Sequence, residues 1–247
     1  YVEACDCSDG DAVMMMSERV VRCHGVPDVV VNCAGQGQWR FLHEMTPDQV
    51  RGCMRVPLLA SALVSGAFLP RMRARGAGSI VVIQSPISRA AIPGATAYVT
   101  ARYALRGLCE GLERELEGSE VLVQEVVLPG LQSNYWANNP GSIERMPWCF
   151  PLLGLFTDTT CRTAASWVCG AIEGRRRLYV GGTLLSMYQS LNAAVPGFPA
   201  MLTFLVGNTG HTLLSPLDSP PQIPWGAEAA AAVSGATTPS ATPIPTP

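Results

Sequence analysis

Three runs of apolar residues constrain the fold of this chain more than any other feature. They are DVVVNCAG (28–35), SIVVIQS (79–85) and VLVQEVVLPG (121–130), and they are largely apolar at successive positions rather than at alternate ones. Strands of this kind are typical of a parallel sheet that helices cover on both faces. Helical patterns separate the runs, so the sequence predicts βαβ units in an α/β, doubly wound, Rossmann-like parallel sheet.

Helical spacing fills the segments between these runs. It covers residues 12–24, 47–74, 97–117 and 160–173. The second helix should start at Thr46-Pro47, with a hydroxyl cap and a proline in the first turn. Pro57 falls inside the same helix and predicts a kink. A short β-like run at 1–5 and a strand at 176–182 complete the expected sheet, whose crossovers should be right-handed.

Composition divides the chain into three parts. Residues 1–182 carry the alternating strand and helix patterns of the predicted Rossmann-like domain, 183–218 are an apolar segment, and 219–247 are rich in Pro, Ala, Ser and Thr and should be disordered. Pro196, Gly197 and Pro199 break the apolar segment into pieces shorter than the ~20 residues that cross a bilayer. It is therefore interpreted as a substrate lid or a subunit interface, with peripheral membrane contact as the alternative.

Charge and cysteine content exclude some classes of protein. The net charge of −2 argues against a nucleic-acid-binding protein, which would carry a basic face. The nine cysteines form no paired CxxC motifs and lack suitably spaced histidines, so no metal site is predicted. Their odd number also disfavours a secreted disulfide framework and favours an intracellular protein with reduced, mostly buried thiols.

A serine, a tyrosine and an arginine carry the chemistry suggested by the pattern. Ser85 ends the second strand, Tyr98 follows thirteen residues later at the start of a helix, and Arg102 shares its helix face at i+4. A tyrosine with a pKa of about 10 needs a nearby cation to act as an acid or base at neutral pH. Together the three residues suit carbonyl reduction. The alternative is that Tyr98 is an ordinary core residue and Arg102 its solvated neighbour.

Two strand ends offer a place for a flat ligand, because parallel sheets bind ligands beyond the carboxyl ends of their strands. Asn32-Cys33-Ala34-Gly35 has small residues that allow close approach to the backbone. VVLPG (126–130) is followed by Ser133 and Asn134, which could hold a carboxamide.

In combination these segments resemble the short-chain dehydrogenase/reductase family. Its members carry an Asn-Asn-Ala-Gly strand end, a catalytic serine, a Tyr-x-x-x-Lys helix and a Pro-Gly loop that grips nicotinamide. Here VNCAG (31–35), SIVVIQS (79–85), YVTARYALRGLCEGLEREL (98–116) and VVLPG (126–130) follow in that order, and the resemblance covers roughly residues 1–182. It implies an oxidoreductase that uses NADP or NAD, NADP being slightly favoured, to move a hydride to or from a carbonyl or alcohol carbon.

The resemblance also assigns roles to residues. Tyr98 would be the proton donor, Ser85 would orient the substrate carbonyl, and Arg102 would stand where the family has its lysine. The cofactor-binding residues would be Asp6 at the adenine, Asn32, Ala34, Gly35, Tyr98, Arg102, Pro129, Gly130 and Ser133.

Three departures from the family pattern qualify this assignment. Arg102 replaces a lysine that bonds the nicotinamide ribose, and the exchange is not conservative at a bonding site. Pro57 replaces a helix asparagine that holds a relay water. The glycine-rich phosphate loop and the first βαβ unit would precede Tyr1, so we expect an N-terminally truncated chain. The alternatives are a catalytically impaired relative that binds or scaffolds, or an incomplete gene product.

Expectations about substrate and partners rest on the same resemblance. NCAG, LEREL and the apolar segment after residue 182 resemble reductases of lipid-like ketones, such as 3-ketodihydrosphingosine reductase. Family members pair through the two helices expected here at 47–74 and 97–117, which implies a homodimer or homotetramer. The location would be cytoplasmic or at the endoplasmic-reticulum membrane.

Overall fold

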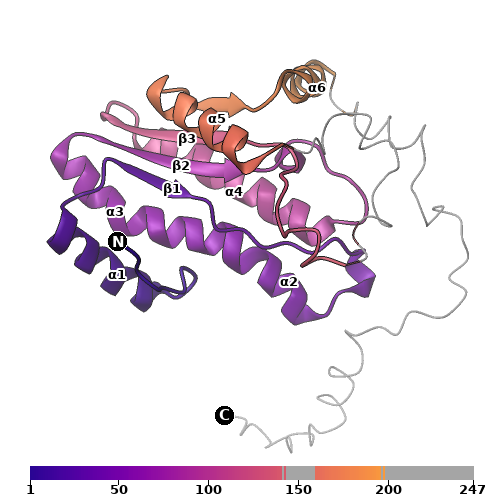
Figure 1. The fold of residues 1–247 in the computed structure, drawn as a ribbon, viewed down its shortest axis with the longest axis horizontal. Helices are drawn as coiled ribbons and strands as arrows, with labels where there is room; N and C mark the ends of the chain where they lie inside the picture. Colours follow the sequence, from indigo (N-terminus) through magenta and orange to yellow (C-terminus); the bar gives the residue numbers. More distant parts are fainter. Residues whose placement is uncertain (141, 143–158, 196, 198–247) are drawn as a thin grey trace, which may run out of the picture.

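A parallel sheet forms the centre of the molecule. The computed structural model describes residues 1–140, 142, 159–195 and 197. In that part of the chain the strands pair in the order β1-β2-β3-β4, and every pairing is parallel. Their bounds are Val29–Asn32 (β1), Gly78–Gln84 (β2), Val121–Val127 (β3) and Leu178–Val180 (β4). The predicted α/β parallel architecture is therefore confirmed (Figure 1).

Helices connect the strands and begin at capping residues that are visible in the sequence. They are α1 (Gly10–His24), α2 (Pro47–Met54), α3 (Ala60–Arg75), α4 (Thr96–Glu115), α5 (Cys161–Glu173) and α6 (Thr183–Ala194). The Asp9 carboxylate accepts from the backbone N–H groups of Asp11 and Ala12 at the start of α1. Thr46 and Gln49 form a reciprocal capping box at the start of α2. These side chains satisfy backbone donors that have no partner within the helix.

The two faces of the sheet bury different helices. On one face Val30, Ile80 and Val123 pack in a cluster with residues of α1, α3 and α4. On the other face Val81 and Val126 pack against α5. Successive residues of a strand point to opposite faces, which is why β2 contributes Ile80 to one layer and Val81 to the other. Figure 1 shows α1 and α3 on one side of the sheet and α5 on the other, as in a doubly wound fold.

One crossover departs from the predicted handedness. The sheet order advances in one direction, yet α3 and α4 lie on one face and α5 on the opposite face. The β3–α5–β4 crossover therefore has the opposite hand to the two before it, and the expectation that every crossover is right-handed was wrong. More than thirty residues separate β3 from α5. The rule describes compact βαβ units, in which the twist of the strand leads directly into the helix.

Residues 1–5 do not form the expected strand. None of the described strands runs beside them, so their backbone N–H and C=O groups have no ladder to join, and β-like residues alone do not make a strand. Asp6 at the end of this run accepts from the backbone N–H of Ser8 and pairs with Arg55 of the following helical segment.

Pro57 lies in a π-helical turn and does not end the helical segment. The turn spans Arg55–Leu59 between α2 and α3, and the N–H of Ala60 bonds to the carbonyl of Arg55, five residues back. Proline has no N–H to offer, and a wider turn accommodates its ring. The continuous segment Pro47–Arg75 is long and apolar enough to cross a membrane by length and composition alone. In this fold its apolar residues, such as Phe68 and Met72, pack against the sheet.

Helix α6 lies against the loop that follows β2. Its Gln189 donates to the carbonyl of Pro86 at 3.0 Å, and its Asn192 donates to the carbonyl of Arg89 at 2.7 Å. Tyr188 of the same helix joins a buried aromatic and aliphatic cluster. The rest of the predicted 183–218 segment, apart from residues 195 and 197, and the predicted tail at 219–247 lie outside the described residues.

The eight cysteines in the described residues are free, but they are not mostly buried as predicted. Cys149 lies outside the described residues, and of the eight thiols within them only Cys53 and Cys109 are buried. Cys23, Cys161 and Cys169 are exposed, since they occupy helix positions that face away from the sheet. An apolar sequence context therefore predicted their burial incorrectly, because the face of the helix decides it.

The two classes of thiol should differ in reactivity. Burial raises the pKa of Cys109 to about 12, and the residue is 2% exposed. We expect brief alkylation at roughly pH 8 to label Cys23, Cys161 and Cys169 but to leave Cys109 unlabelled until denaturant is added, because the thiolate is the nucleophile. Peptide mass spectrometry measures this. Native labelling of Cys109 as fast as that of Cys169 would contradict the predicted burial.

Candidate active site

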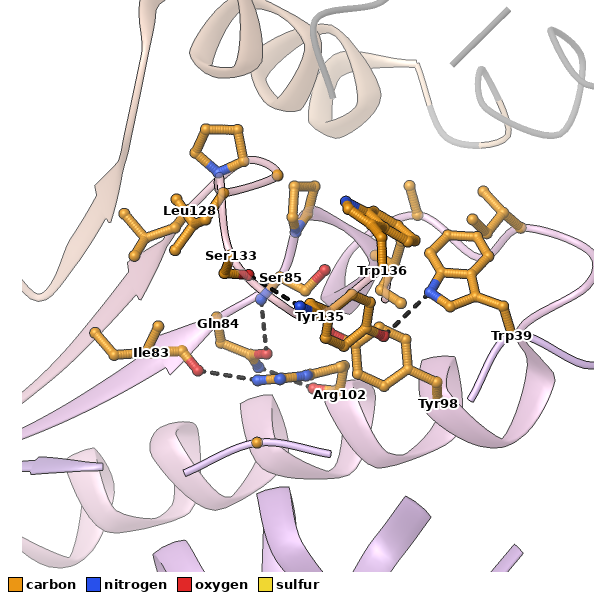
Figure 2. A pocket seen from close by; sticks show the side chains of 18 of the residues that line it. Trp39, Ile83, Gln84, Ser85, Tyr98, Arg102, Leu128, Ser133, Tyr135 and Trp136 are labelled. Atoms are coloured by element: carbon orange, nitrogen blue, oxygen red, sulfur yellow. Dashed lines mark hydrogen bonds between the residues drawn. The ribbon is translucent and has the colours of Figure 1, made fainter. Parts of the chain in front are cut away.

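A cavity of about 240 Å³ opens at the carboxyl ends of the central strands. Ligands of open parallel sheets bind at this edge. The lining comes from the loops after β1, β2 and β3 and from helices α4 and α6. Figure 2 shows aromatic side chains gathered on one side of it, with Ile83 and Leu128 on the other. The predicted site residues found in its wall are Gly35, Ser85, Tyr98, Arg102, Pro129, Gly130 and Ser133.

Ser85 is positioned by the last residue of β2. The side chain of Gln84 is 2% exposed, and its Oε1 accepts from the backbone N–H of Ser85 at 3.2 Å. The amide nitrogen of the same side chain donates to the carbonyl of Arg102 at 2.9 Å. Gln84 therefore links the turn that carries Ser85 to helix α4.

Tyr98 lies in the first turn of α4 and is 7% exposed. Its ring packs closely on the backbone of Gly37, where an added Cβ would lie 2.4 Å from Cδ2 of the tyrosine. The rings of Trp39 and Tyr135 stand at centroid distances of 6.4 Å from it. The loop after β1 thus makes room for Tyr98 by having no side chain at position 37.

Arg102 is buried beside Tyr98 and is not the solvated neighbour of the alternative interpretation. Its guanidinium carbon lies 5.0 Å from the centre of the Tyr98 ring, within the range of a cation–π contact. One terminal nitrogen donates to the carbonyl of Ile83 at 3.0 Å, and the other would be 3.0 Å from a Cβ at Gly35. Its Nε has no hydrogen-bond partner in the described structure.

The loop after β3 is held in place by the segment that leads to α5. The carbonyl of Gly130 accepts from the backbone N–H of Thr159 at 3.3 Å, and the N–H of Gln132 donates back to Thr159 at 2.9 Å. Ser133 accepts from the N–H of Tyr135 at 3.3 Å. Pro129, Gly130 and Ser133 consequently face the same cavity as Tyr98.

Three predicted cofactor-binding residues lie outside this cavity. Asn32 and Ala34 line a smaller neighbouring hollow of about 90 Å³, where the Asn32 amide donates to Ser65 at 3.0 Å. Asp6 lines neither space. Hydrogen bonds from Ser8 hold the pKa of Asp6 below its ordinary value, and Arg55 contributes a favourable charge. The geometry therefore separates these three residues from the group around Tyr98.

Sequence reasoning missed the aromatic wall of the cavity. Its members beyond Tyr98 are Trp39, Tyr135, Trp136 and Tyr188. Aromatic residues are only 7% of the chain, so the aromatic residues gathered in the loops after β1 and β3 were a signal available in the sequence. The indole N–H of Trp39 donates to the Tyr135 hydroxyl at 3.1 Å. Burial raises the pKa of Tyr135, and its interaction with Tyr98 raises it further.

A buried ion pair near the cavity was also missed. Arg89, in the loop after Ser85, pairs with Glu125 of β3, which is 5% exposed. Burial raises the pKa of Glu125, while the charge of Arg89 opposes that shift. The carbonyl of Arg89 accepts from Asn192 of α6. The pair therefore anchors this loop to the sheet, and α6 lies against the loop.

The family model of short chain dehydrogenases matches residues 1–141. This chain belongs to the short-chain dehydrogenase family. It is 30% identical over 155 residues to 2,3-dihydroxy-2,3-dihydro-p-cumate dehydrogenase of Pseudomonas putida, which is 61% of this chain and 60% of that protein. It is 33% identical over 111 residues to dehydrogenase RED3 of Cochliobolus heterostrophus, covering 45% of this chain and 57% of that one. The chain thus spans at most about 60% of the length of these two curated relatives.

A solved relative supports the same membership. The structure of a short-chain dehydrogenase from Streptomyces avermitilis matches with a TM-score of 0.65 and 25% identity, over 81% of this chain and 77% of that one. The predicted family resemblance and Rossmann-like fold are therefore confirmed.

Gly37 offers a test of the packing around Tyr98 in this short-chain dehydrogenase. Gly37→Ala places a methyl group within the tyrosine ring, and we expect it to cost about 1–3 kcal/mol of unfolding free energy. Gly52→Ala is the matched control, because its Cβ meets nothing within 4 Å and lies in helix α2. It should be neutral or stabilise by up to ~1 kcal/mol. Urea unfolding compares the two, and equal midpoints would contradict the packing.

Proposed function

We propose that this short-chain dehydrogenase is an NAD(P)-dependent oxidoreductase that moves a hydride between nicotinamide and a carbonyl or alcohol carbon. The observation that carries the proposal is the convergence of Ser85, Tyr98 and Arg102 on one cavity at the carboxyl edge of the sheet. These are a hydrogen-bonding hydroxyl, a proton donor and a fixed cation, which carbonyl reduction requires. Since the chain spans only part of its relatives, the activity is proposed for this chain and not carried over from them.

The residues around the cavity suit a nicotinamide ring. Gly35, Pro129 and Gly130 present little side chain, so a flat ring can approach the backbone. The Nε of Arg102 is buried without a partner in the described structure, which makes it a donor suited to an oxygen acceptor such as a ribose hydroxyl. We propose NADP or NAD as the cofactor, which would donate or accept the hydride.

Each of the three side chains has one role in the proposed reaction. During reduction Tyr98 gives its phenolic proton to the carbonyl oxygen, and during oxidation its phenolate takes the proton back. The guanidinium of Arg102 lies over the tyrosine ring and favours the charged phenolate. The Ser85 hydroxyl donates a hydrogen bond to the reacting oxygen and orients it.

The arginine at position 102 fits the composition of the whole chain. All 17 basic residues are arginine, and there is no lysine. Arginine therefore stands at every position of this chain that carries a fixed positive charge. For that reason, arginine in place of lysine at 102 is weak evidence that catalysis has been lost. Pro57 is the observation that favours the second candidate, a catalytically impaired relative that binds or scaffolds. Its π turn carries a proline ring where the family has a polar side chain.

Removal of the phenol tests the main proposal. We expect Tyr98→Phe to lower kcat by roughly 100-fold or more with NADP or NAD and a panel of ketones and secondary alcohols, because a general acid contributes about that factor. Tyr103→Phe is the control, since Tyr103 lies on the same helix but is 41% exposed. It should leave kcat unchanged. A wild-type protein that binds cofactor but turns over none of the ketones and alcohols would contradict the proposal.

Restoration of the family residues distinguishes the two candidates. For an active enzyme adapted to arginine, the double change Arg102→Lys and Pro57→Asn should alter kcat by less than about tenfold in either direction. The cation is retained, and the π turn already accommodates the helix. The measurement is steady-state turnover of the wild-type and double-variant proteins. An increase of 100-fold or more would favour the impaired relative.

The substrate and partners belong to the same proposal. A wall of apolar and aromatic side chains supports an uncharged substrate, of which a lipid-like ketone is one candidate. We propose that the chain divides into segments 1–182, 183–218 and 219–247. The position of α6 over the cavity supports the second segment as a substrate lid. Exposed apolar residues support peripheral membrane contact, at Leu184, Met187 and Leu191 of α6 and at Val195 directly after it.

Self-association and location remain parts of the proposal. We propose a homo-oligomer through α4 and through the segment that contains α3, where Leu59 beside α3 is an exposed apolar residue. We propose an intracellular location, either cytoplasmic or at the endoplasmic-reticulum membrane.

A further inference from the structure

A second phenol stands beside Tyr98 and takes no part in the proposed chemistry. Tyr135 lies on the loop after β3, and its hydroxyl oxygen accepts the indole N–H of Trp39 at 3.1 Å. An indole is a donor only, whereas a phenol both accepts and donates. The contact with Trp39 therefore leaves the O–H of Tyr135 as a donor. Figure 2 shows Trp39 and Tyr135 joined in this way above the ring of Tyr98.

Several contacts fix the position of Tyr135. Its backbone N–H donates to Ser133 at 3.3 Å, and its carbonyl accepts from Asn139 at 2.8 Å. Its ring meets Trp136 edge-on at a centroid distance of 5.0 Å and stands 6.4 Å from the ring of Tyr98. A hydroxyl held this firmly can discriminate between ligands, because it loses little freedom on binding.

The surroundings of Tyr135 decide what its hydroxyl can bind. Among the described residues that line the cavity, Arg102 is the only ionised side chain, and Ile83 and the Tyr98 ring already engage it. Burial raises the pKa of Tyr135, so the phenol stays protonated and remains a donor at neutral pH. An uncharged oxygen acceptor is the partner that suits a neutral donor between aromatic walls.

We infer that Tyr135 binds a second oxygen of the substrate, adjacent to the oxygen on which Tyr98 acts, and that the substrate is an uncharged ring bearing a vicinal diol or hydroxyketone. This rests on the proposed function. Trp39, Trp136 and Tyr188 supply flat faces for a ring. The rings of Tyr98 and Tyr135 stand at a centroid distance of 6.4 Å and line the same cavity, so both hydroxyls are available to one small ring that carries two neighbouring oxygens.

The reaction of such a diol balances without a further reagent. One carbinol carbon loses its hydrogen, with the electron pair, to the oxidised nicotinamide. Its hydroxyl proton passes to the phenolate of Tyr98, and a C=O bond forms. The neighbouring hydroxyl keeps its bonds and stays on Tyr135 throughout. Tyr135 is thus a specificity-determining residue rather than an acid or base.

A matched pair of ligands tests the inference by binding. The dissociation constants of cis-1,2-cyclohexanediol and cyclohexanol are measured by ligand-observed NMR on the 247-residue chain with NADP or NAD present. We expect the diol to bind roughly fivefold to tenfold more tightly, the worth of one neutral hydrogen bond. Tyr135→Phe should abolish this preference while cyclohexanol binding stays within about twofold. Trp39→Phe should reduce it, and the exposed Tyr103→Phe should retain it.

The outcomes separate this inference from the proposed function. Equal affinities in the wild-type protein, no binding of the diol, or a preference that survives Tyr135→Phe would each overturn it. An equal loss of both ligands in Tyr135→Phe would indicate a purely structural role and overturn it as well. Turnover of simple alcohols without a diol preference would contradict the role of Tyr135 but would support the proposed oxidoreductase activity. A diol preference without turnover of either compound would support the second oxygen contact and remove the proposed enzymatic activity.

Discussion

The side chains of β2 from Ser79 to Val82 are all buried, on both faces of the sheet. Helices must cover each face, because an uncovered apolar face would stay in contact with water. Parallel pairing then sends every connection from one end of the sheet to the other. The carboxyl ends of β1, β2 and β3 consequently meet along one edge, and the loops that follow them build the cavity.

Arg102 shows what this arrangement demands of a buried charge. Desolvation of a guanidinium costs several kcal/mol, and no carboxylate in the described part of the chain pairs with it. A backbone carbonyl at the end of β2 and the face of Tyr98 compensate for part of that cost. Gly35 and Gly37 leave the necessary space, one for the guanidinium and one for the ring. Cation, phenol and glycines therefore form one interdependent unit.

Much of the fold followed from local patterns. The apolar runs at β1, β2 and β3 and the cap at Thr46 depend on short-range spacing, which a sequence displays directly. The run at 1–5 and the hand of the crossover through α5 were predicted wrongly, because each depends on elements distant in the chain. The exposure of Cys161 and Cys169 was missed for a similar reason, since helix orientation decides it.

For the candidate site, the sequence by itself determined that Ser85, Tyr98 and Arg102 share one edge of the sheet, because strand ends and helical spacing settle that much. Only the tertiary structure decided that Asn32 and Ala34 face a separate hollow and that Arg102 is buried. It also brought Trp39 and Tyr135, far apart in the chain, into hydrogen-bonding contact. The physical reason is that loop conformations depend on the packing of several elements at once, whereas strands and helices follow a local period.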